Sequence, residues 1–147
     1  MEPLTSDPEV LEAYSTDASL FKVKPKWVAF PRNAEDIKEL VKTARERGTS
    51  LTMRAAGSDM SGGPLNDGII ADVTKFMNKV GEIKVEGTKV EPGLFYREFE
   101  LLTVGKGLLL PCYTASKNLA ALGGMVANNC GGELSLRYGK MEDWVRE

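Results

Sequence analysis

Residues 51–63 read LTMRAAGSDMSGG, an apolar stretch that runs directly into a loop rich in glycine and serine. Residues 51–53 favour a short β-strand. The glycines and serines that follow allow the backbone to turn sharply and to aim several N–H groups into one concavity. Such a nest binds phosphate oxygens, although a tight surface turn has the same composition. The stretch therefore predicts either a phosphate-binding loop after a strand or a plain turn.

Two common phosphate-binding motifs are absent from this sequence. The loop has no Gly-Lys-Ser/Thr ending, so it is not a Walker A loop, and no G-x-G-x-x-G pattern occurs anywhere in the chain. A P-loop nucleotidase and a Rossmann dehydrogenase are both disfavoured.

The residues on either side of this stretch predict a βαβ lobe. Residues 27–30, WVAF, form a short apolar run typical of a buried strand. Asn33 is a helix N-cap, and Gly48 ends a helix whose apolar residues recur with helical spacing. Residues 68–73 predict a third strand. We expect these short strands to lie parallel, because a helical crossover joins parallel strands.

The second half of the chain has a different pattern. Residues 83–85 and 88–90 alternate around a Glu-Gly pair, which is typical of a hairpin, and residues 94–104 predict an amphipathic helix that Gly105 ends. We therefore expect an α+β fold, in which the N-terminal βαβ lobe precedes a second α+β lobe with antiparallel strands.

Composition excludes several classes of protein. The chain has 147 residues, so one domain is the first expectation, and its net charge of −2 excludes a strongly basic nucleic-acid binder. It has no apolar run that could span a bilayer and no signal-peptide pattern at the N-terminus. Cys112 and Cys130 are too few for a disulfide scaffold, so a reducing cytoplasm is expected. Residues 1–20 carry five acids and no base, which predicts a solvated acidic N-terminal arm.

The sequence contains no histidine. Ser-His-Asp and Cys-His catalysis and histidine-ligated zinc are therefore excluded within this chain, and we expect no metal site. Any chemistry must come from a bound cofactor, from other side chains or from a partner.

A second glycine-rich stretch lies at residues 120–132, which read AALGGMVANNCGG. Paired glycines at 123–124 and 131–132 bracket small residues. A wall of this kind can approach a flat ligand closely and offer backbone hydrogen bonds. The alternative is a glycine-rich helix cap and turn.

The two stretches, in this order, resemble the FAD-binding domain of the vanillyl-alcohol oxidase / p-cresol methylhydroxylase flavoproteins. Residues 54–63 are similar to the diphosphate loop of that family, and residues 123–132, followed by Arg-Tyr-Gly at 137–139, are similar to its second flavin-contacting segment. Residues 90–93 and 110–111 also fit. Residues 14–21, YSTDASLF, are most similar to the branch that contains D-lactate and D-2-hydroxyglutarate dehydrogenases.

The resemblance implies that FAD lies extended between two subdomains. Residues 1–20 are then an acidic arm, 21–82 the first subdomain with the diphosphate loop, and 83–147 part of the second. The backbone of residues 55–58 and the hydroxyls of Ser58 and Ser61 are expected to hold the diphosphate, whereas the second stretch is expected to line the flavin and ribityl. The cofactor-binding candidates are Arg54, Ala55, Ala56, Gly57, Ser58, Asp59, Ser61, Gly62, Pro111, Gly123, Gly124, Ala127, Asn129 and Gly131. Arg54 is either such a ligand or a salt-bridge support of the loop.

Some residues depart from the family pattern. Covalent members have histidine where this chain has Ser58, so the resemblance implies non-covalent FAD. Many members have threonine where this chain has Ala121, so one side-chain hydrogen bond is missing. Cys130 is interpreted as a small buried apolar group.

Family members continue beyond the stretch that corresponds to residue 147, with further strands and a substrate-binding cap. We therefore expect the second lobe to be incomplete and the chain alone to be inactive. We name no catalytic residue in this chain. An exposed apolar face would then favour self-association, and its candidate residues are Leu108, Leu109, Leu110, Val126 and Trp144.

The leading functional hypothesis is the FAD-binding portion of an oxidoreductase that oxidises a small 2-hydroxy acid, of the D-lactate or D-2-hydroxyglutarate type, by hydride transfer to flavin N5. Electrons would leave to an acceptor protein or a quinone. The alternative is a non-catalytic flavin-fold lobe that serves as an assembly or interaction module. A phosphate-ligand binding protein of another fold is the third hypothesis.

Overall fold

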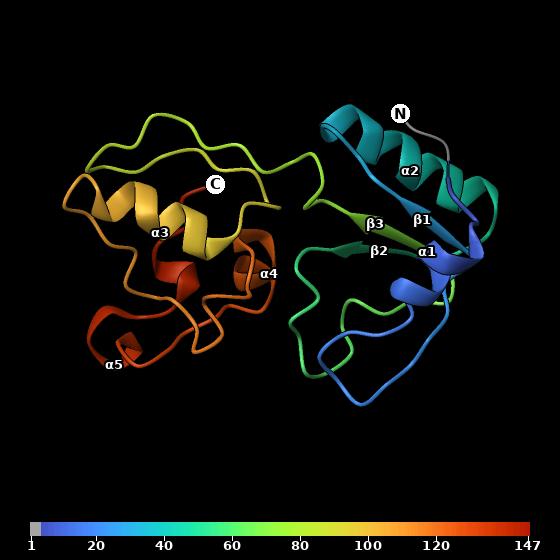
Figure 1. The fold of residues 1–147 in the computed structure, drawn as a ribbon. Helices are drawn as coiled ribbons and strands as arrows, with labels where there is room; N and C mark the ends of the chain where they lie inside the picture. The colour runs from blue at the N-terminus through green and yellow to red at the C-terminus, as the bar shows by residue number, and fades with distance from the viewer. Residues whose placement is uncertain (1–3) are drawn as a thin grey trace.

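A computed structural model describes residues 4–147 (Figure 1). Within them, β1 (Trp27–Ala29), β2 (Leu51–Arg54) and β3 (Ile69–Asp72) form a parallel sheet in the order β1-β3-β2. The expected parallel strands are confirmed. β3 takes the central place because its residues are buried on both faces of the sheet, and Ile70 is fully buried opposite both outer strands.

Helix α2 (Ala34–Glu46) connects β1 to β2 and covers one face of the sheet (Figure 1). It begins after Asn33, as predicted, and the Asn33 side chain accepts a hydrogen bond from the Asp36 N–H at 3.0 Å. Leu40 is fully buried and packs with core residues of β1 and β3. The helical spacing of its apolar residues thus places them on the face of α2 that packs against the sheet.

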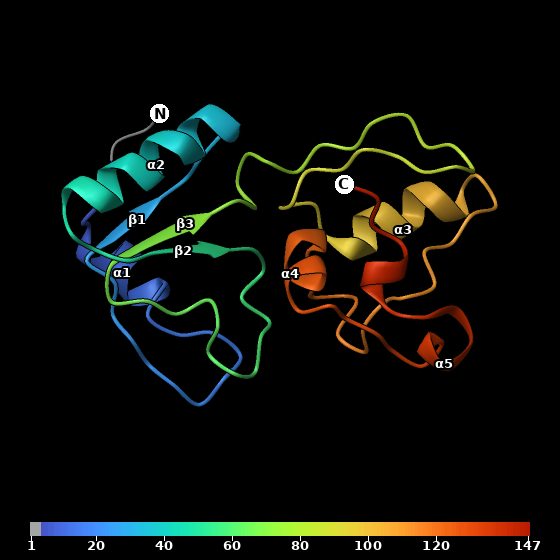
Figure 2. The ribbon, with the colours of Figure 1, turned by 180° about the vertical axis from the view of Figure 1, so that it is seen from behind.

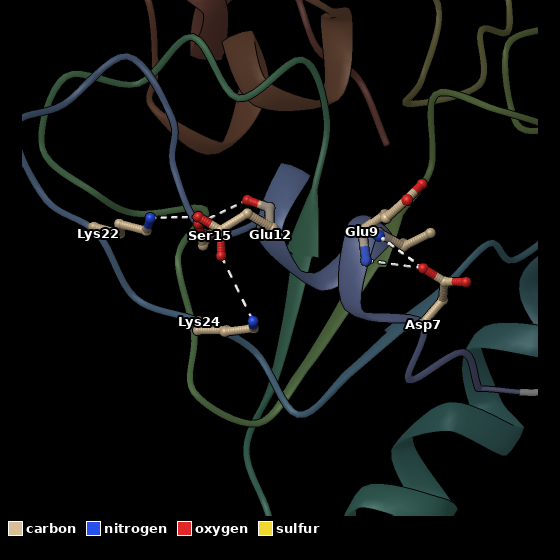
Figure 3. A network of polar contacts seen from close by, with 7 residues as sticks. Asp7, Glu9, Glu12, Ser15, Lys22 and Lys24 are labelled. Carbon is tan, nitrogen blue, oxygen red and sulfur yellow. Dashed lines mark hydrogen bonds and ion pairs between the residues drawn. The ribbon is translucent and has the colours of Figure 1, made fainter.

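The N-terminal segment is folded rather than free. Helix α1 (Pro8–Ala13) is capped by Asp7, whose carboxylate accepts two backbone N–H groups of the first turn. Figure 3 shows Glu12 among polar side chains, where it pairs with Lys22 and with Lys24. Asp7, Glu9 and Glu12 are exposed, as expected, but they belong to an ordered local network.

The backbone of the same segment packs against the sheet. Thr5 forms an antiparallel bridge with Val28 of β1, and Ser15 is fully buried. Val23 donates its N–H to the Ser15 carbonyl at 2.9 Å. Our interpretation of residues 1–20 as a solvated arm therefore misses the packing of its described part, residues 4–20, because backbone pairing with a distant strand leaves no pattern in the local sequence.

The expected antiparallel strands of the second half do not form as strands. Residues 83–85 and 88–90 have only isolated antiparallel bridges in their neighbourhood, between Val80 and Val90 and between Lys84 and Gly87. A two-stranded hairpin has marginal stability unless it buries an apolar face. Val85 is 82% exposed, so this hairpin has little apolar area to bury.

After β3 the described residues contain four short helices joined by long loops, and Figures 1 and 2 show these helices on the opposite side of the molecule from the sheet. They are α3 (Tyr96–Val104), α4 (Leu122–Ala127), α5 (Ser135–Tyr138) and the 3-10 helix η1 (Met141–Asp143). Helix α3 ends at Gly105, as predicted. Tyr96 is fully buried and donates its hydroxyl to the Leu110 carbonyl at 2.8 Å. Burial raises the pKa of the Cys112 thiol, which packs in the same core.

Candidate functional site

A cavity of about 550 Å³ lies between the loop that follows β2 and the segment that carries α4. Met53 and residues 55–61 and 63–64 form one wall, and residues drawn from 114–130 form the other. The structure thus brings together the two glycine-rich stretches that the sequence singled out. The candidates that line the cavity are Ala55, Ala56, Gly57, Ser58, Asp59, Ser61, Gly124 and Ala127.

The first wall presents unused backbone donors. Within the described part of the chain, the N–H groups of residues 55–58 donate no hydrogen bond. Gly57 has a φ of +67°, in the left-handed region where glycine is favoured. The Ser58 hydroxyl also has no hydrogen-bond partner among residues 4–147. Successive free N–H groups in a turn are the feature that binds anionic oxygens.

Arg54 supports this wall from behind and does not line the cavity. Its guanidinium donates to the carbonyls of Tyr14 at 3.4 Å and Thr16 at 2.9 Å, and lies 5.1 Å from the centre of the Tyr14 ring. A Cβ added at Gly57 would lie 2.6 Å from Arg54 Nη2, so the guanidinium fills the space beside that glycine. The support that we expected as a salt bridge is therefore made to carbonyl oxygens.

Asp59 organises the far end of the loop. Its carboxylate accepts the Ser61 N–H at 3.0 Å, the Ser61 hydroxyl at 2.9 Å and the Gly63 N–H at 2.9 Å. These bonds, led by the Ser61 N–H, hold the pKa of the Asp59 carboxyl below its usual value. Because the Ser61 hydroxyl proton is directed to Asp59, it is not available to another acceptor in this conformation.

The second wall is shaped by close packing. A Cβ at Gly123 would lie 2.6 Å from Pro92 Cβ, and one at Gly131 would lie 3.0 Å from Ser135 Cβ. Neither glycine lines the cavity, because each lies against a neighbouring segment. Asn129 has a φ of +44°, and its side chain accepts the N–H of Glu142 at 3.0 Å, so it braces η1.

Two further candidates lie outside the cavity. Gly62 lies against Phe21, because a Cβ at Gly62 would come within 2.9 Å of the Phe21 ring. Pro111 lines a separate apolar groove of about 340 Å³, together with side chains that include Arg137 and Trp144. Six of the fourteen candidates thus do not line the cavity: Arg54, Gly62, Pro111, Gly123, Asn129 and Gly131.

A family model described as "FAD binding domain" matches residues 25–147. The chain belongs to this FAD-binding family. This FAD-binding chain is 35% identical, over 136 residues, to D-2-hydroxyglutarate dehydrogenase of Escherichia coli (strain K12). The aligned region covers 89% of the chain and 13% of that protein. It is 30% identical, over 137 residues, to the glycolate oxidase subunit GlcD of Bacillus subtilis (strain 168), covering 90% of the chain and 29% of that subunit. The chain therefore spans less than a third of either relative.

Solved structures share the fold of this FAD-binding chain. Alkyldihydroxyacetonephosphate synthase superposes with a TM-score of 0.83 at 23% identity, over 97% of the chain and 30% of the synthase chain. For 6-hydroxy-D-nicotine oxidase from Arthrobacter nicotinovorans the TM-score is 0.81 at 22% identity, over 96% of the chain and 31% of the oxidase chain. These likenesses establish the architecture.

The cavity of this FAD-binding chain suits an anionic, partly flat cofactor. The N–H groups of residues 55–58, which donate no hydrogen bond in the structure, would be available to diphosphate oxygens, and the small residues Gly124 and Ala127 line the other wall. No lysine or arginine belongs to the lining found among the described residues. The charge of a diphosphate bound here would therefore be offset by backbone dipoles, with the Arg54 cation behind the loop.

Sequence reasoning missed part of the lining of this cavity. Thr114 and Ser116 contribute hydroxyls, which lie 3.2 Å apart, and the hydroxyl-rich run at 113–116 was the signal that could have marked them. Cys130 was interpreted as a buried packing residue, but it is only partly buried and lines the cavity. Burial raises the pKa of its thiol, which keeps the thiol protonated.

None of the helices in the described residues has the length and apolar character needed to cross a membrane.

Proposed function

We propose that this chain is the FAD-binding portion of an oxidoreductase that oxidises a 2-hydroxy acid of the D-2-hydroxyglutarate or D-lactate type. Support comes from relatives that carry those names, among them a D-lactate dehydrogenase of Archaeoglobus fulgidus that is 29% identical over 124 residues. The bound flavin supplies the hydride acceptor, and an acceptor protein or a quinone removes the electrons. The observation that carries the proposal is that residues 55–58 line the cavity and that their N–H groups donate no hydrogen bond among the described residues.

We propose the following roles for the residues of the chain. Residues 21–82 act as the first FAD-binding subdomain and residues 83–147 as part of the second, with residues 1–20 preceding them. The N–H groups of residues 55–58 and the Ser58 hydroxyl bind the diphosphate. Gly124 and Ala127 approach the flavin and ribityl. This division follows the cavity, which both stretches line.

The chain contributes binding and orientation, and we assign it no catalytic residue. Each wall residue with a perturbed pKa has a structural explanation, since Asp59 braces its loop and Cys130 is partly buried. Substrate is expected to be bound by residues outside this chain, so the chain alone is inactive. We place the enzyme in a reducing cytoplasm, in agreement with two free cysteines.

The second candidate function is a non-catalytic lobe that serves as an assembly or interaction module. Exposed apolar side chains favour it: Leu109 is 45% exposed, Val126 44% and Trp144 44%. Self-association through these side chains is compatible with either function, because it does not involve the cavity between the two walls.

Titration of the purified chain with FAD separates the two functions. The first predicts saturable quenching of flavin fluorescence, and no reduction of an artificial acceptor dye when D-2-hydroxyglutarate or D-lactate is added. A chain that takes up no FAD would support the interaction module instead. Dye reduction at rates typical of dehydrogenases would contradict the assignment of catalysis to residues outside the chain.

The same complex tests the mode of attachment. Ser58 stands where covalent relatives have histidine, and the chain has no histidine at all. We therefore expect acid precipitation to release all of the flavin into the supernatant. Fluorescence that stays with the protein band on a denaturing gel would contradict non-covalent binding.

A further inference from the structure

Residues 14–21 contact the 54–63 loop at Gly57 and at Gly62, the two glycines of the loop that have a positive φ. Gly57 and Gly62 have φ values of +67° and +82°. Ala18 donates its N–H to the Gly57 carbonyl at 3.1 Å, and Phe21 lies where a Cβ on Gly62 would point. The match to the FAD-binding family begins only at residue 25. The contacts thus come from outside the matched residues. They fall on the two loop positions whose backbone is in the left-handed region.

Arg54 links this segment to the end of the sheet. Its guanidinium holds the carbonyls of Tyr14 and Thr16 and lies over the Tyr14 ring. Tyr14 in turn donates its hydroxyl to Asp72, the last residue of β3, at 2.5 Å. Burial, with the Asp72 hydrogen bond in addition, raises the pKa of Tyr14 well above its ordinary value of 10, so the hydroxyl remains a donor. The segment is thereby tied to β3 and to the residue that begins the loop.

Peptide geometry connects these contacts to the cavity. The Gly57 carbonyl and the Ser58 N–H belong to the same peptide unit, and they point in opposite directions because the peptide is trans. When Ala18 holds the Gly57 carbonyl, the Ser58 N–H is directed away from the N-terminal segment. Ser58 lines the cavity and its N–H is one of the four free donors. The segment therefore orients a donor that it does not itself use.

We propose that residues 14–21 and Arg54 form a clasp that holds the 54–63 loop in its anion-binding conformation, so that Arg54 and Ala18 are positioning residues of the FAD site. The proposal rests on the proposed FAD binding for its functional consequence, but the clasp itself is a property of the free protein. Arg54 acts through Gly57, beside which its guanidinium lies, and contributes a positive charge behind the nest without lining the cavity.

Arg54→Lys tests the clasp, because lysine keeps the charge and loses the fork that reaches two carbonyls. Two readouts on the full chain are used: hydrogen exchange of the Ser61 and Gly63 amides, which donate to Asp59 within the loop, measured without ligand, and FAD affinity by fluorescence titration. We expect both the exchange rate and the FAD dissociation constant to rise about tenfold, as for loss of a hydrogen bond to a charged group. Arg47→Lys is the matched control, because Arg47 lies over the Trp27 ring at 4.8 Å and is remote from the cavity lining. It is expected to change neither readout.

Ala18→Pro is the second variant, because proline has no N–H to hold the Gly57 carbonyl; it also fixes the backbone φ at residue 18. Ala18 is exposed, so the core is not disturbed, and Ala18→Ser is the control that keeps the N–H. We expect faster exchange of the Ser61 and Gly63 amides and weaker FAD binding in Ala18→Pro alone.

The outcomes distinguish the clasp from the proposed function. Faster loop exchange in Arg54→Lys and Ala18→Pro, in a wild-type chain that binds no FAD, would support the clasp and refute FAD binding. Weaker FAD binding with unchanged loop exchange would make Arg54 a direct ligand and overturn the clasp. Wild-type values for both readouts in both variants would also overturn it.

Discussion

The two glycine-rich walls of the cavity look alike in sequence and differ in what their glycines do. In the 54–63 loop, Gly57 and Gly62 have positive φ, so glycine is required by the backbone conformation. In the 120–132 stretch, Gly123 and Gly132 have no positive φ, and glycine is required because another segment lies too close for a Cβ. In the first stretch glycine meets a need of the backbone conformation, and in the second it permits close packing. Glycine content alone does not separate these two uses.

The largest expected effect is on the 120–132 stretch, where glycine permits close packing. A Cβ at Gly132 would lie 2.0 Å from the Tyr113 carbonyl oxygen, which is backbone and cannot move away easily. We expect Gly132→Ala to lower the free energy of unfolding by about 3 kcal/mol, measured by urea denaturation. Gly124→Ala is the control, because its Cβ would meet Ala55 Cβ at an ordinary 3.6 Å. Equal stability of the two variants would break the comparison.

Gly57→Val tests the 54–63 loop, where the backbone conformation requires glycine. A left-handed non-glycine residue costs about 1–2 kcal/mol, and the new side chain would also displace the Arg54 guanidinium, which lies 2.6 Å from the Cβ position. We expect FAD uptake to be lost while the far-UV circular dichroism changes little. Gly48→Val is the matched control, with a φ of +58° and no atom within 4 Å of its Cβ. It should have a similar cost in stability and should bind FAD normally, and normal FAD titration of Gly57→Val would refute the role of this loop.

The two serines of the 54–63 loop differ in whether their hydroxyl is free, and this difference can be tested separately. Ser58 has a free hydroxyl among the described residues, whereas the Ser61 hydroxyl donates to Asp59 at 2.9 Å. We expect Ser58→Ala to raise the FAD dissociation constant about fivefold, the effect of one hydrogen bond of about 1 kcal/mol. Ser61→Ala is expected to change it by less than about twofold. The reverse order would show that the Ser61 hydroxyl turns to the cofactor.

The smallest effect concerns pH and the far end of the loop. The folded-state pKa of Asp59 lies below its ordinary value of 3.8, so its contribution to loop order is fully present above about pH 4 and is lost as the pH falls through the folded pKa. We expect exchange of residues 59–63, corrected for intrinsic rates, to be constant from pH 7 to pH 5 and faster below pH 4. Asp59→Asn should lack this acid transition. A transition between pH 5 and pH 7 would contradict the assignment to Asp59.

Much of the first half could be predicted from local sequence. The parallel strands near residues 27–30, 51–53 and 68–73 and the helix after Asn33 follow from apolar spacing and capping, which act over a few residues. The hairpin at residues 83–90 could not be predicted reliably, because alternation shows which side chains share a face and not whether a partner face exists.

The sequence by itself determined the family, the order of the elements and the two stretches that line the cavity, because each is encoded in contiguous residues. Only the tertiary structure decided which residues of those stretches face the cavity. Arg54 and Gly62 face a segment some forty residues upstream, and Gly123 faces Pro92. Distances between residues far apart in the chain are set by the packing of whole elements, and local propensity carries no information about them.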